Sequence, residues 1–393
     1  MTQNRKGSAL LIVFLGLMSA MAPLATDMYL PALPEVQKSF AMDASMAQLT
    51  LTMTLLGMSC GQIFIGSLSD HWGRKRPLLI GMIVFTLATI GCILATNIGL
   101  FLTFRALQGF SGASGIVIAR AIARDVAEGV ELTRFFSILM MVNGLAPIMA
   151  PVLGGEILAF FPWRGVFVAL FFVGLLQILQ VIFFRETLPP EKRLASVARS
   201  IRAYPMLLTN RYFFGHCLLQ CFAFAGFFSY IAGSSFVFQD IYKLSAQTYS
   251  YIFGTIGSGL LLIGFLPARL AGRVKDETML KYALLVSLLS GLLLLIAFIV
   301  GQPPLLLTIG LIFCNVVPLA VTGSASFSLA LSRQGKNAGS ASALVGFFSM
   351  FLGGLLMPLV GVLGTSSALP MATLMFTGAL FAFLAFLRYV RGA

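Results

Sequence analysis

The chain has 393 residues, of which 59% are hydrophobic and 10% are charged, and its mean hydropathy is +0.96. An ordinary soluble domain carries about 25% charged residues, so this composition excludes a soluble globular protein. The net charge of +13 could indicate a nucleic-acid partner, an acidic lipid surface or a membrane topology signal, and the positions of the basic residues decide among these.

Twelve apolar segments follow one another along the chain. They span 8–31, 45–68, 77–96, 99–121, 134–158 and 163–184 in the first half, and 211–235, 247–268, 279–300, 303–331, 338–362 and 367–388 in the second. A helix of about 20 apolar residues crosses a hydrocarbon core of about 30 Å. The runs do not alternate between apolar and polar residues, so they favour helices over barrel strands. The sequence therefore predicts an all-α membrane protein with twelve transmembrane helices.

The basic residues gather in the N-terminal segment, in the even-numbered connections and at the C-terminus. Lys38, Arg164 and Lys243 fall in the odd-numbered connections and Arg105 lies inside an apolar run, which leaves 22 of the 26 on one side. This asymmetry is the positive-inside pattern, so it indicates topology and not nucleic-acid binding. We expect a multi-pass protein of the bacterial inner membrane with both termini in the cytoplasm.

The longest polar connection lies between the sixth and seventh apolar segments, from Arg185 to Asn210. It divides the chain into two sets of six helices, as in many secondary transporters that are built from repeats. We expect a six-helix bundle at 1–186, a cytoplasmic linker at 187–210 and a second six-helix bundle at 211–393.

The connection between the second and third segments carries a glycine, an aspartate and a basic cluster at fixed spacing. From Gly66 to Arg76 it reads GSLSDHWGRKR, which resembles motif A of the major facilitator superfamily. Asp70 would stabilise the N-terminus of the eleventh helix near Gly339, and Arg74 would pair with Asp125. The conformational latch then comprises Gly66, Asp70, Gly73, Arg74 and Asp125. A simple basic stop-transfer loop is the alternative.

Two further motifs lie inside apolar segments. The fourth segment contains FRALQGFSG around Arg105, similar to the superfamily's motif B. An arginine within a membrane costs from about 2.5 kcal/mol upward, so it marks a function or a partner. The fifth contains APIMAPVLGG, which resembles the antiporter motif C through Pro147, Pro151, Gly154 and Gly155. An ordinary kinked helix is the alternative for this segment.

The end of the first segment reads TDMYLPALP from Thr26 to Pro34. It resembles the signature of the Bcr/CflA branch of drug–proton antiporters, and the sequence RETLP from Arg185 is similar to that branch too. The resemblance implies a major facilitator fold, proton antiport and efflux of drugs or metabolites. We expect Asp27 to carry the proton with Arg105 as its partner, and Glu156 and Asp240 are the next candidates.

Several aromatic and amide side chains could line the binding cavity for a small, mainly apolar or drug-like substrate. They are Tyr29, Gln108, Asn143, Phe224, Phe227 and Tyr230. We expect no cofactor and no metal, because the chain has no Walker-type phosphate loop and its two histidines lack neighbouring ligands. Enzymatic catalysis is therefore not expected. The energy source would be the proton gradient, and the partners would be the substrate, protons and the bilayer, with a functional monomer.

Two alternatives stay open. The first is a proton-coupled exporter of a specific metabolite or sugar on the same scaffold, because a fold does not determine a substrate. The second is a channel or a receptor, which would show ion flux without countertransport or no net transport.

Overall fold

A computed structural model describes residues 2–127, 129–193, 203–270, 273–332, 334 and 338–390. Within these ranges, the side chains of 2–10, 12, 22, 129–141, 143–144, 192, 203, 268 and 338–339 are outside the description. All regular secondary structure in the described part of the chain is helical.

The first half of the chain forms six long helices. They are α1 (Thr2–Asp27), continued by the short η1 (Leu30–Ala32) and α2 (Leu33–Ser39), then α3 (Ala44–Trp72), α4 (Lys75–Leu94), α5 (Ile98–Val126), α6 (Gly129–Phe160) and α7 (Arg164–Phe183). Side-chain caps fix two of the helix starts. Asp43 accepts the N–H of Met46 at the start of α3, and Asn97 accepts the N–H of Leu100 at the start of α5.

The second half repeats this pattern after the short linker helices η2 (Pro190–Lys192) and α9 (Ala203–Thr209). Its elements are α10 (Arg211–Phe236) with η3 (Val237–Ile241), α11 (Ala246–Gly264), α12 (Leu266–Leu270), α13 (Asp276–Val300), α14 (Leu305–Val316), α15 (Leu319–Ser332), α16 (Ala338–Val360), and α17 (Leu369–Ala385) with η5 (Phe386–Val390). The segment predicted at 303–331 is broken into α14 and α15 at Pro318, because proline has no N–H for a helical hydrogen bond.

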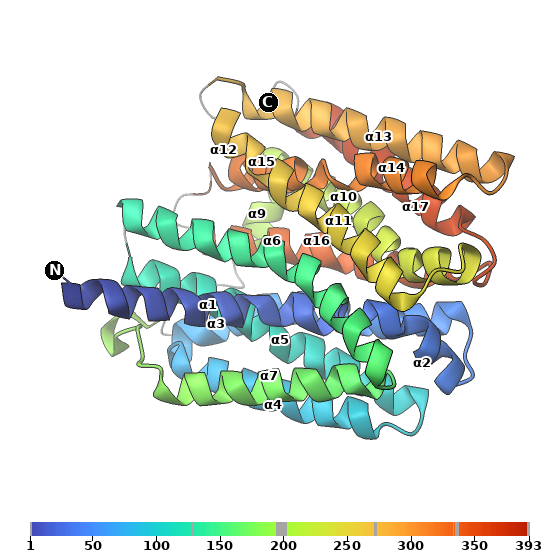
Figure 1. Cartoon of the computed structure of the whole chain (residues 1–393). Coiled ribbons are helices and arrows are strands. Elements are labelled where there is room, and N and C mark those ends of the chain that lie inside the picture. Colours follow the sequence, from blue (N-terminus) through green and yellow to red (C-terminus); the bar gives the residue numbers. More distant parts are fainter. Residues whose placement is uncertain are drawn as a thin grey trace.

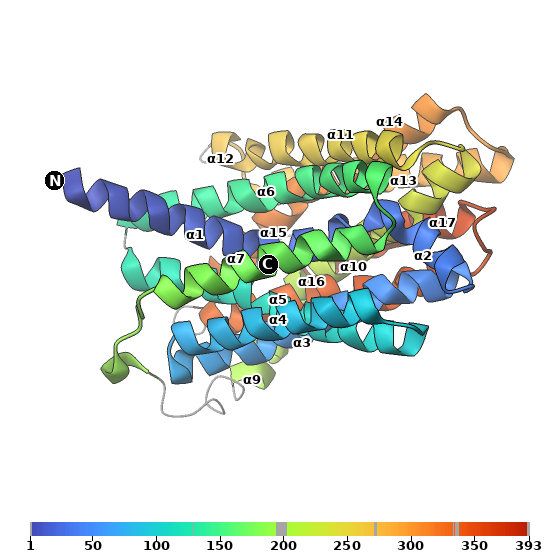
Figure 2. The ribbon, with the colours of Figure 1, turned by 60° about the horizontal axis from the view of Figure 1, so that its bottom comes forward.

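Ten of the described helices are long and apolar enough to cross a membrane. α6 and α11 run alongside them, which gives six long helices in each half (Figure 2). The blue-to-green ribbon of the first half fills the lower part of Figure 1, and the yellow-to-red ribbon of the second half fills the upper part. The predicted twelve-helix fold is therefore confirmed. The predicted domain boundaries stay predictions, since 194–202 of the linker lie outside the description.

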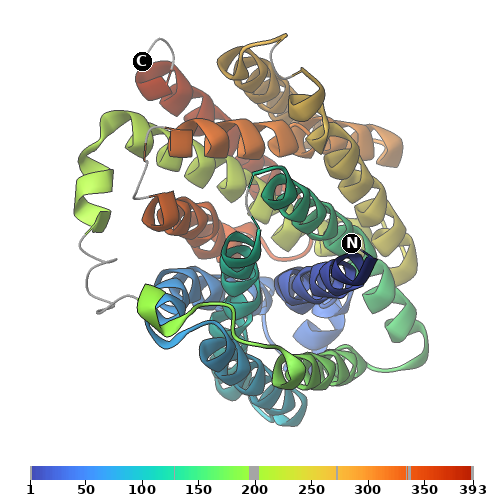
Figure 3. The same ribbon diagram turned by 90° about the vertical axis from the view of Figure 1, so that its left-hand side faces the viewer.

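The two ends of the bundle differ in composition. The end that carries the start of α1 and the loop between α3 and α4 contains Arg74, Lys75 and Arg76, and we call it the basic end (Figure 3). The opposite end carries η1, α2 and the turn before α7, and we call it the far end. The functional groups described below lie at the basic end and toward the far end.

The two halves meet along two pairs of helices, α3 with α16 and α6 with α11. We call this contact surface the seam. Direct hydrogen bonds cross it toward the far end: Thr52 Oγ1 donates to the Gly354 carbonyl at 2.7 Å, and Ser45 Oγ donates to the Pro358 carbonyl. In addition, Ser235 Oγ donates to the Leu30 carbonyl at 2.9 Å. The far end of the seam is therefore closed in this structure.

Candidate functional site

Arg105 lies on α5 in the core of the first half and is fully buried. Its Nη1 donates to the Ala25 carbonyl at 2.9 Å and to Gln108 Oε1 at 2.6 Å. The guanidinium carbon lies 4.6 Å from the ring centre of Tyr29 and 5.6 Å from that of Phe167. The positive charge is thus stabilised by neutral acceptors and aromatic faces, which are favourable partners for a desolvated cation.

Asp27 is the last residue of α1 and is 6% exposed. Its Oδ1 accepts a hydrogen bond from Thr26 Oγ1 at 3.0 Å. The carboxyl group also interacts electrostatically with Tyr230 of α10 and Tyr249 of α11. Asp27 therefore belongs to the seam, with its carboxyl group near tyrosines of the second half.

This structure contains no ion pair between Asp27 and Arg105, and the expected partnership of the two residues in proton coupling stays a prediction. Both side chains are described, and no ion pair joins them. The physical reason is that Arg105 packs against Tyr29 and Phe167 of its own half, whereas Asp27 interacts with tyrosines of the other half. The position of a residue along a helix does not fix the side to which its side chain points.

The expected substrate residues fall into two groups. Tyr29 and Gln108 are fully buried and belong to the surroundings of Arg105: the Tyr29 hydroxyl is hydrogen-bonded to Thr50 Oγ1 at 3.0 Å, and Gln108 Nε2 donates to Thr89 Oγ1 at 2.8 Å. Their polar atoms are thus engaged within the first half. Asn143 lies on α6, and its side chain is outside the described residues.

The other three expected residues, Phe224, Phe227 and Tyr230, form a connected aromatic row along α10 of the second half. Phe227 also lines a small cavity of about 20 Å³ inside that half. The Tyr230 ring stacks on Phe253 with centres 5.4 Å apart and 15° between the planes. The structure therefore places these three in the second half, where Tyr230 shares a buried apolar cluster with Tyr29 of the first half.

The two further acidic candidates lie toward the far end. Glu156 bridges the seam, because its Oε1 accepts the Tyr251 hydroxyl at 2.7 Å and its Oε2 accepts Gln247 Nε2 at 3.4 Å. Asp240 interacts electrostatically with Lys38 and Lys243. These three residues line an open hollow of about 390 Å³.

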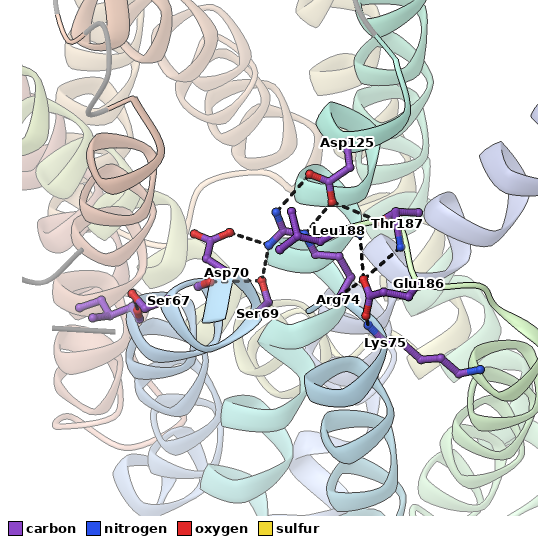
Figure 4. A network of polar contacts seen from close by, with 11 residues as sticks. Ser67, Ser69, Asp70, Arg74, Lys75, Asp125, Glu186, Thr187 and Leu188 are labelled. Atoms are coloured by element: carbon purple, nitrogen blue, oxygen red, sulfur yellow. Dashed lines mark hydrogen bonds and ion pairs between the residues drawn. The ribbon is translucent and has the colours of Figure 1, made fainter. Parts of the chain in front are cut away.

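At the basic end, Arg74 is the centre of a polar network (Figure 4). Its Nε and Nη2 donate to the two carboxylate oxygens of Asp125 at 2.7 and 3.1 Å, so the expected pair of Arg74 with Asp125 is present. Its Nη1 donates to Asp70 and to Ser69 Oγ. Burial lowers the pKa of Arg74, but the two carboxylates outweigh this and raise it above its ordinary value. Arg74 therefore keeps its positive charge within the network.

Sequence reasoning missed Glu186, which completes this network. Its carboxylate accepts the backbone N–H groups of Arg74 at 2.9 Å and Lys75 at 3.1 Å, and also those of Thr187 and Leu188, each at 3.0 Å. Partial burial opposes the charge, but these four donors outweigh it and hold the pKa of Glu186 below its ordinary value of 4.5. Glu186 thus caps the start of α4. The sequence signal for Glu186 is the RETLP pattern, from which no role for a single residue was predicted.

Glycine is present at positions 73 and 66 for different structural reasons. Gly73 has φ +92°, and a Cβ there would lie 2.5 Å from Glu186 Oε2, so the loop requires glycine. A Cβ at Gly66 would lie 3.3 Å from Val117 Cγ1, which is tight but not a clash with backbone.

The expected contact of Asp70 with the eleventh helix near Gly339 involves a side chain outside the description and stays a prediction. Asp70 itself is paired with Arg74.

The antiporter-motif residues lie where α6 approaches two other helices. Pro147 and Pro151 are inside α6. A Cβ at Gly154 would lie 2.1 Å from the Met28 carbonyl oxygen, and a Cβ at Gly155 would lie 2.5 Å from Ser250 Oγ of α11. The two glycines therefore allow α6 to pack against the end of α1 and, across the seam, against α11.

Comparison with known proteins decides the family. The sequence pattern described as Major Facilitator Superfamily matches residues 15–358. The chain belongs to this superfamily. This transporter is 39% identical over 380 residues to "Uncharacterized MFS-type transporter YdgK" of Bacillus subtilis (strain 168), a match that covers 96% of this chain and 94% of the relative.

Other relatives support the Bcr/CflA branch. The transporter is 32% identical over 370 residues to the "Bicyclomycin resistance protein homolog" of Haemophilus influenzae, covering 94% of this chain and 93% of that one. It is 26% identical over 276 residues to "Multidrug resistance protein MdtL" of Salmonella heidelberg, covering 70% of each chain. A solved D-xylose-proton symporter has the same fold, with a TM-score of 0.77 over 96% of this chain and 97% of that one at 14% identity. The chain is therefore a membrane transporter of small molecules and not an enzyme.

Proposed function

We propose that this transporter exports small, mainly apolar or drug-like compounds across the bacterial inner membrane in exchange for protons. The names of two relatives, which mention bicyclomycin resistance and multidrug resistance, support this substrate class. The observation that carries the proposal is Asp27, a buried carboxyl group at the seam that has no ion-pair partner among the described residues.

A carboxyl group in such a place is stable when it carries a proton, because an unpaired buried charge costs much free energy. Asp27 can lose that proton when the halves part and water reaches it. One proton crossing 100 mV supplies about 2.3 kcal/mol, which supports a substrate gradient of roughly fiftyfold. The proton gradient thus serves as the energy source, and no cofactor is needed.

Transport would proceed by alternating access, with each half moving as a unit. The far-end part of the seam is closed by hydrogen bonds such as that of Thr52 with Gly354, and these have to break for the substrate to leave. At the basic end, the latch of Gly66, Asp70, Gly73, Arg74 and Asp125, supported by Glu186, would act through Asp70 on the N-terminus of α16. We propose that a single chain performs the whole cycle.

The orientation in the membrane follows from charge. We propose that the basic end faces the cytoplasm, because basic residues are retained on that side. A fluorescent protein fused after Ala393 should then be bright and alkaline phosphatase fused there should be inactive. The opposite result would reverse the orientation.

The function is tested by export from a pump-deficient bacterium. Cells that express the transporter should accumulate less of its substrates from a drug panel, and a protonophore should remove this difference. Asp27→Asn should abolish proton-driven export while binding of apolar compounds persists, and Glu191→Gln, on the exposed linker, serves as the matched control. Export by Asp27→Asn at the parental rate would exclude Asp27 as the proton carrier. Export of one sugar or metabolite alone would favour the alternative of a specific exporter.

A further inference from the structure

Tyr230 of α10 and Asp27 of α1 lie at nearly the same level of the seam. Both helices begin at the basic end, and the bond from Ser235 Oγ to the Leu30 carbonyl fixes their register. Tyr230 precedes Ser235 by five residues, or about 7.5 Å, and Asp27 precedes Leu30 by three residues, or about 4.5 Å. The backbone register therefore brings the two side chains to within about 3 Å of the same level.

The hydroxyl group of Tyr230 is a buried polar atom of the second half at this level. Tyr230 is 1% exposed, and its hydroxyl has no hydrogen-bond partner among the described residues. Such a group costs free energy, and few buried polar atoms in native proteins are left in this state. The stacking on Phe253 fixes the ring, so the hydroxyl cannot turn away to solvent. We therefore expect this hydroxyl to form a hydrogen bond at another stage of the transport cycle.

Tyr249 provides a contrast within the same cluster. It also interacts electrostatically with Asp27 and is fully buried. Its hydroxyl, however, is already hydrogen-bonded to Ser234 Oγ at 3.1 Å. Of the two tyrosines of the second half that interact with Asp27, Tyr230 alone retains an unused donor.

We propose that Tyr230 is the positioning residue for proton exchange at Asp27: its hydroxyl donates a hydrogen bond to the Asp27 carboxylate once the proton has left. This inference rests on the proposed function and replaces Arg105 with a residue of the other half as the group that responds to the charge of Asp27. When Asp27 is protonated, its charge is absent and the Tyr230 donor stays unused, as in this structure. When the proton passes to water, the carboxylate attracts the Tyr230 hydroxyl across the seam.

The other ionisable and polar groups of the neighbouring helices have partners other than Asp27. Arg105 of α5 donates through Nη1 to the Ala25 carbonyl and Gln108, and although its Nε and Nη2 have no hydrogen-bond partner among the described residues, it interacts electrostatically with Cys92 and Tyr29. Glu156 of α6 accepts Tyr251 and Gln247 of α11. Tyr249 of α11 is bonded to Ser234. On α3, the uncharged Gln48 donates to the Ala232 carbonyl of α10. Tyr230 is thus the described group of the second half that interacts with Asp27 and has a free donor for its carboxylate.

The test follows the protonation of Asp27 directly and needs no substrate. The purified transporter is titrated from about pH 4 to 10 by infrared spectroscopy, and the Asp27 signal is the carboxylic C=O band that Asp27→Asn removes. In Tyr230→Phe, the ring and its stack remain but the donor is lost. Because a hydrogen bond to the carboxylate favours deprotonation, its loss should move the midpoint upward by about one pH unit, a tenfold change in proton affinity.

Tyr249→Phe is the matched control, because it removes a hydroxyl that is already satisfied. Its midpoint should stay within about 0.3 pH unit of the parent. A midpoint in Tyr230→Phe equal to that of the parent, or an equal shift in both variants, overturns the role of Tyr230. A C=O band that does not titrate overturns it too. Export that is insensitive to a protonophore is a different outcome from these, and it would rule out both the proposed function and this inference.

Discussion

Arg105 and Asp27 represent two different solutions for a charged side chain inside a membrane protein. An arginine there costs from about 2.5 kcal/mol upward. Arg105 is stabilised by two neutral acceptors and by the faces of Tyr29 and Phe167, with cation–π contacts that contribute about 2 kcal/mol or more when desolvated. Its surroundings are therefore permanent, whereas those of Asp27 at the seam can change with each opening.

Tyr29 is expected to stabilise the fold through this cation–π contact. Tyr29→Leu removes the ring under the guanidinium and the bond to Thr50, and should destabilise the transporter by about 2–3 kcal/mol. Tyr29→Phe keeps the ring and should cost only about 1 kcal/mol. Thermal unfolding in detergent measures both, with Phe172→Leu on the exposed face of α7 as the control. Equal losses in the two Tyr29 variants would argue against a cation–π contribution.

At the residue scale, the sequence identified the important charged residues more reliably than it identified their interaction partners. Arg105, Asp27, Arg74 and Asp125 could be selected because a charge in or beside an apolar segment is costly. The pairing of Arg74 with Asp125 was predicted correctly, since both lie at helix ends on the same side. The partners of Asp27 were missed, because they belong to the other half and their position depends on how the halves pack.

At the level of elements, the loop between α3 and α4 is built by contacts from three separate segments. Gly73 turns the chain with φ +92°, Arg74 binds Asp125 at the end of α5, and Glu186 after α7 caps the first N–H groups of α4. Thr187 closes the network, because its Oγ1 donates to Asp125 Oδ2 at 3.2 Å. A change in any one of these segments is therefore transmitted to the start of α4.

Glu186 should make the stability of this loop depend on pH. Because its folded-state pKa lies below the ordinary 4.5, its contribution is present above that value and is lost as the pH falls through the lower folded pKa. Glu186→Gln cannot carry the charge and should remove this acid-dependent loss. Hydrogen exchange of the first amides of α4, measured from about pH 6 down to pH 3, reports the effect. Glu191→Gln is the control, and an unchanged pH dependence in Glu186→Gln would contradict the capping role.

Gly155 is expected to control the approach of α6 to α11. In Gly155→Leu the new side chain overlaps Ser250, so the two helices must separate, and overpacking of this kind costs about 1–3 kcal/mol. We expect export to fall and a cysteine probe at the far end of the seam to become more accessible. Gly310→Leu is the control, because nothing lies within 4 Å of a Cβ at that position. Normal export by a well-expressed Gly155→Leu protein would show that close packing here is dispensable.

Element positions were predictable because length and hydropathy are local properties. The twelve apolar segments agree with the helices to within a few residues at most ends. The break at Pro318 was not predicted, although the absence of a proline N–H explains it. The short helix α9 also escaped prediction, because a seven-residue helix in a polar linker has too little apolar periodicity.

At the scale of the whole molecule, the seam is held closed by weak hydrogen bonds that are spread along the boundary between the two halves. The bonds of Ser45, Thr52 and Ser235 all end on backbone carbonyls of the other half, and each contributes about 1 kcal/mol. Such bonds can be exchanged for water without leaving a buried charge. The seam is therefore suited to repeated opening, in contrast to the ion pairs that hold the basic-end loop.

The seam could not be predicted from the sequence. Its contacts join residues about 90 to 310 positions apart, such as Glu156 with Tyr251 and Thr52 with Gly354, and many of their side chains are ordinary serine, threonine and glycine. Nothing in their local pattern distinguishes them from packing residues. The superfamily resemblance implied that two bundles meet, but only the structure shows which helix faces carry the hydrogen bonds.

A cross-link across the seam tests whether the far end must open during transport. A Cβ at Gly354 would lie 3.1 Å from the Cβ of Leu55, close to the separation of about 3.5–4.5 Å in disulfides. The pair Leu55→Cys and Gly354→Cys, made with the exposed Cys60 and Cys314 replaced by serine, should therefore form a disulfide between α3 and α16. The locked protein cannot part at the far end, so oxidation should stop export.

The reducing agent supplies the control within the same protein. Addition of dithiothreitol should restore export, and each single-cysteine variant should export equally under oxidising and reducing conditions. Substrate binding to the oxidised protein should persist, because the basic end is not cross-linked. If the fully oxidised double variant exported at the parental rate, the two halves would not separate at α3 and α16, and the release route would have to pass between other helices.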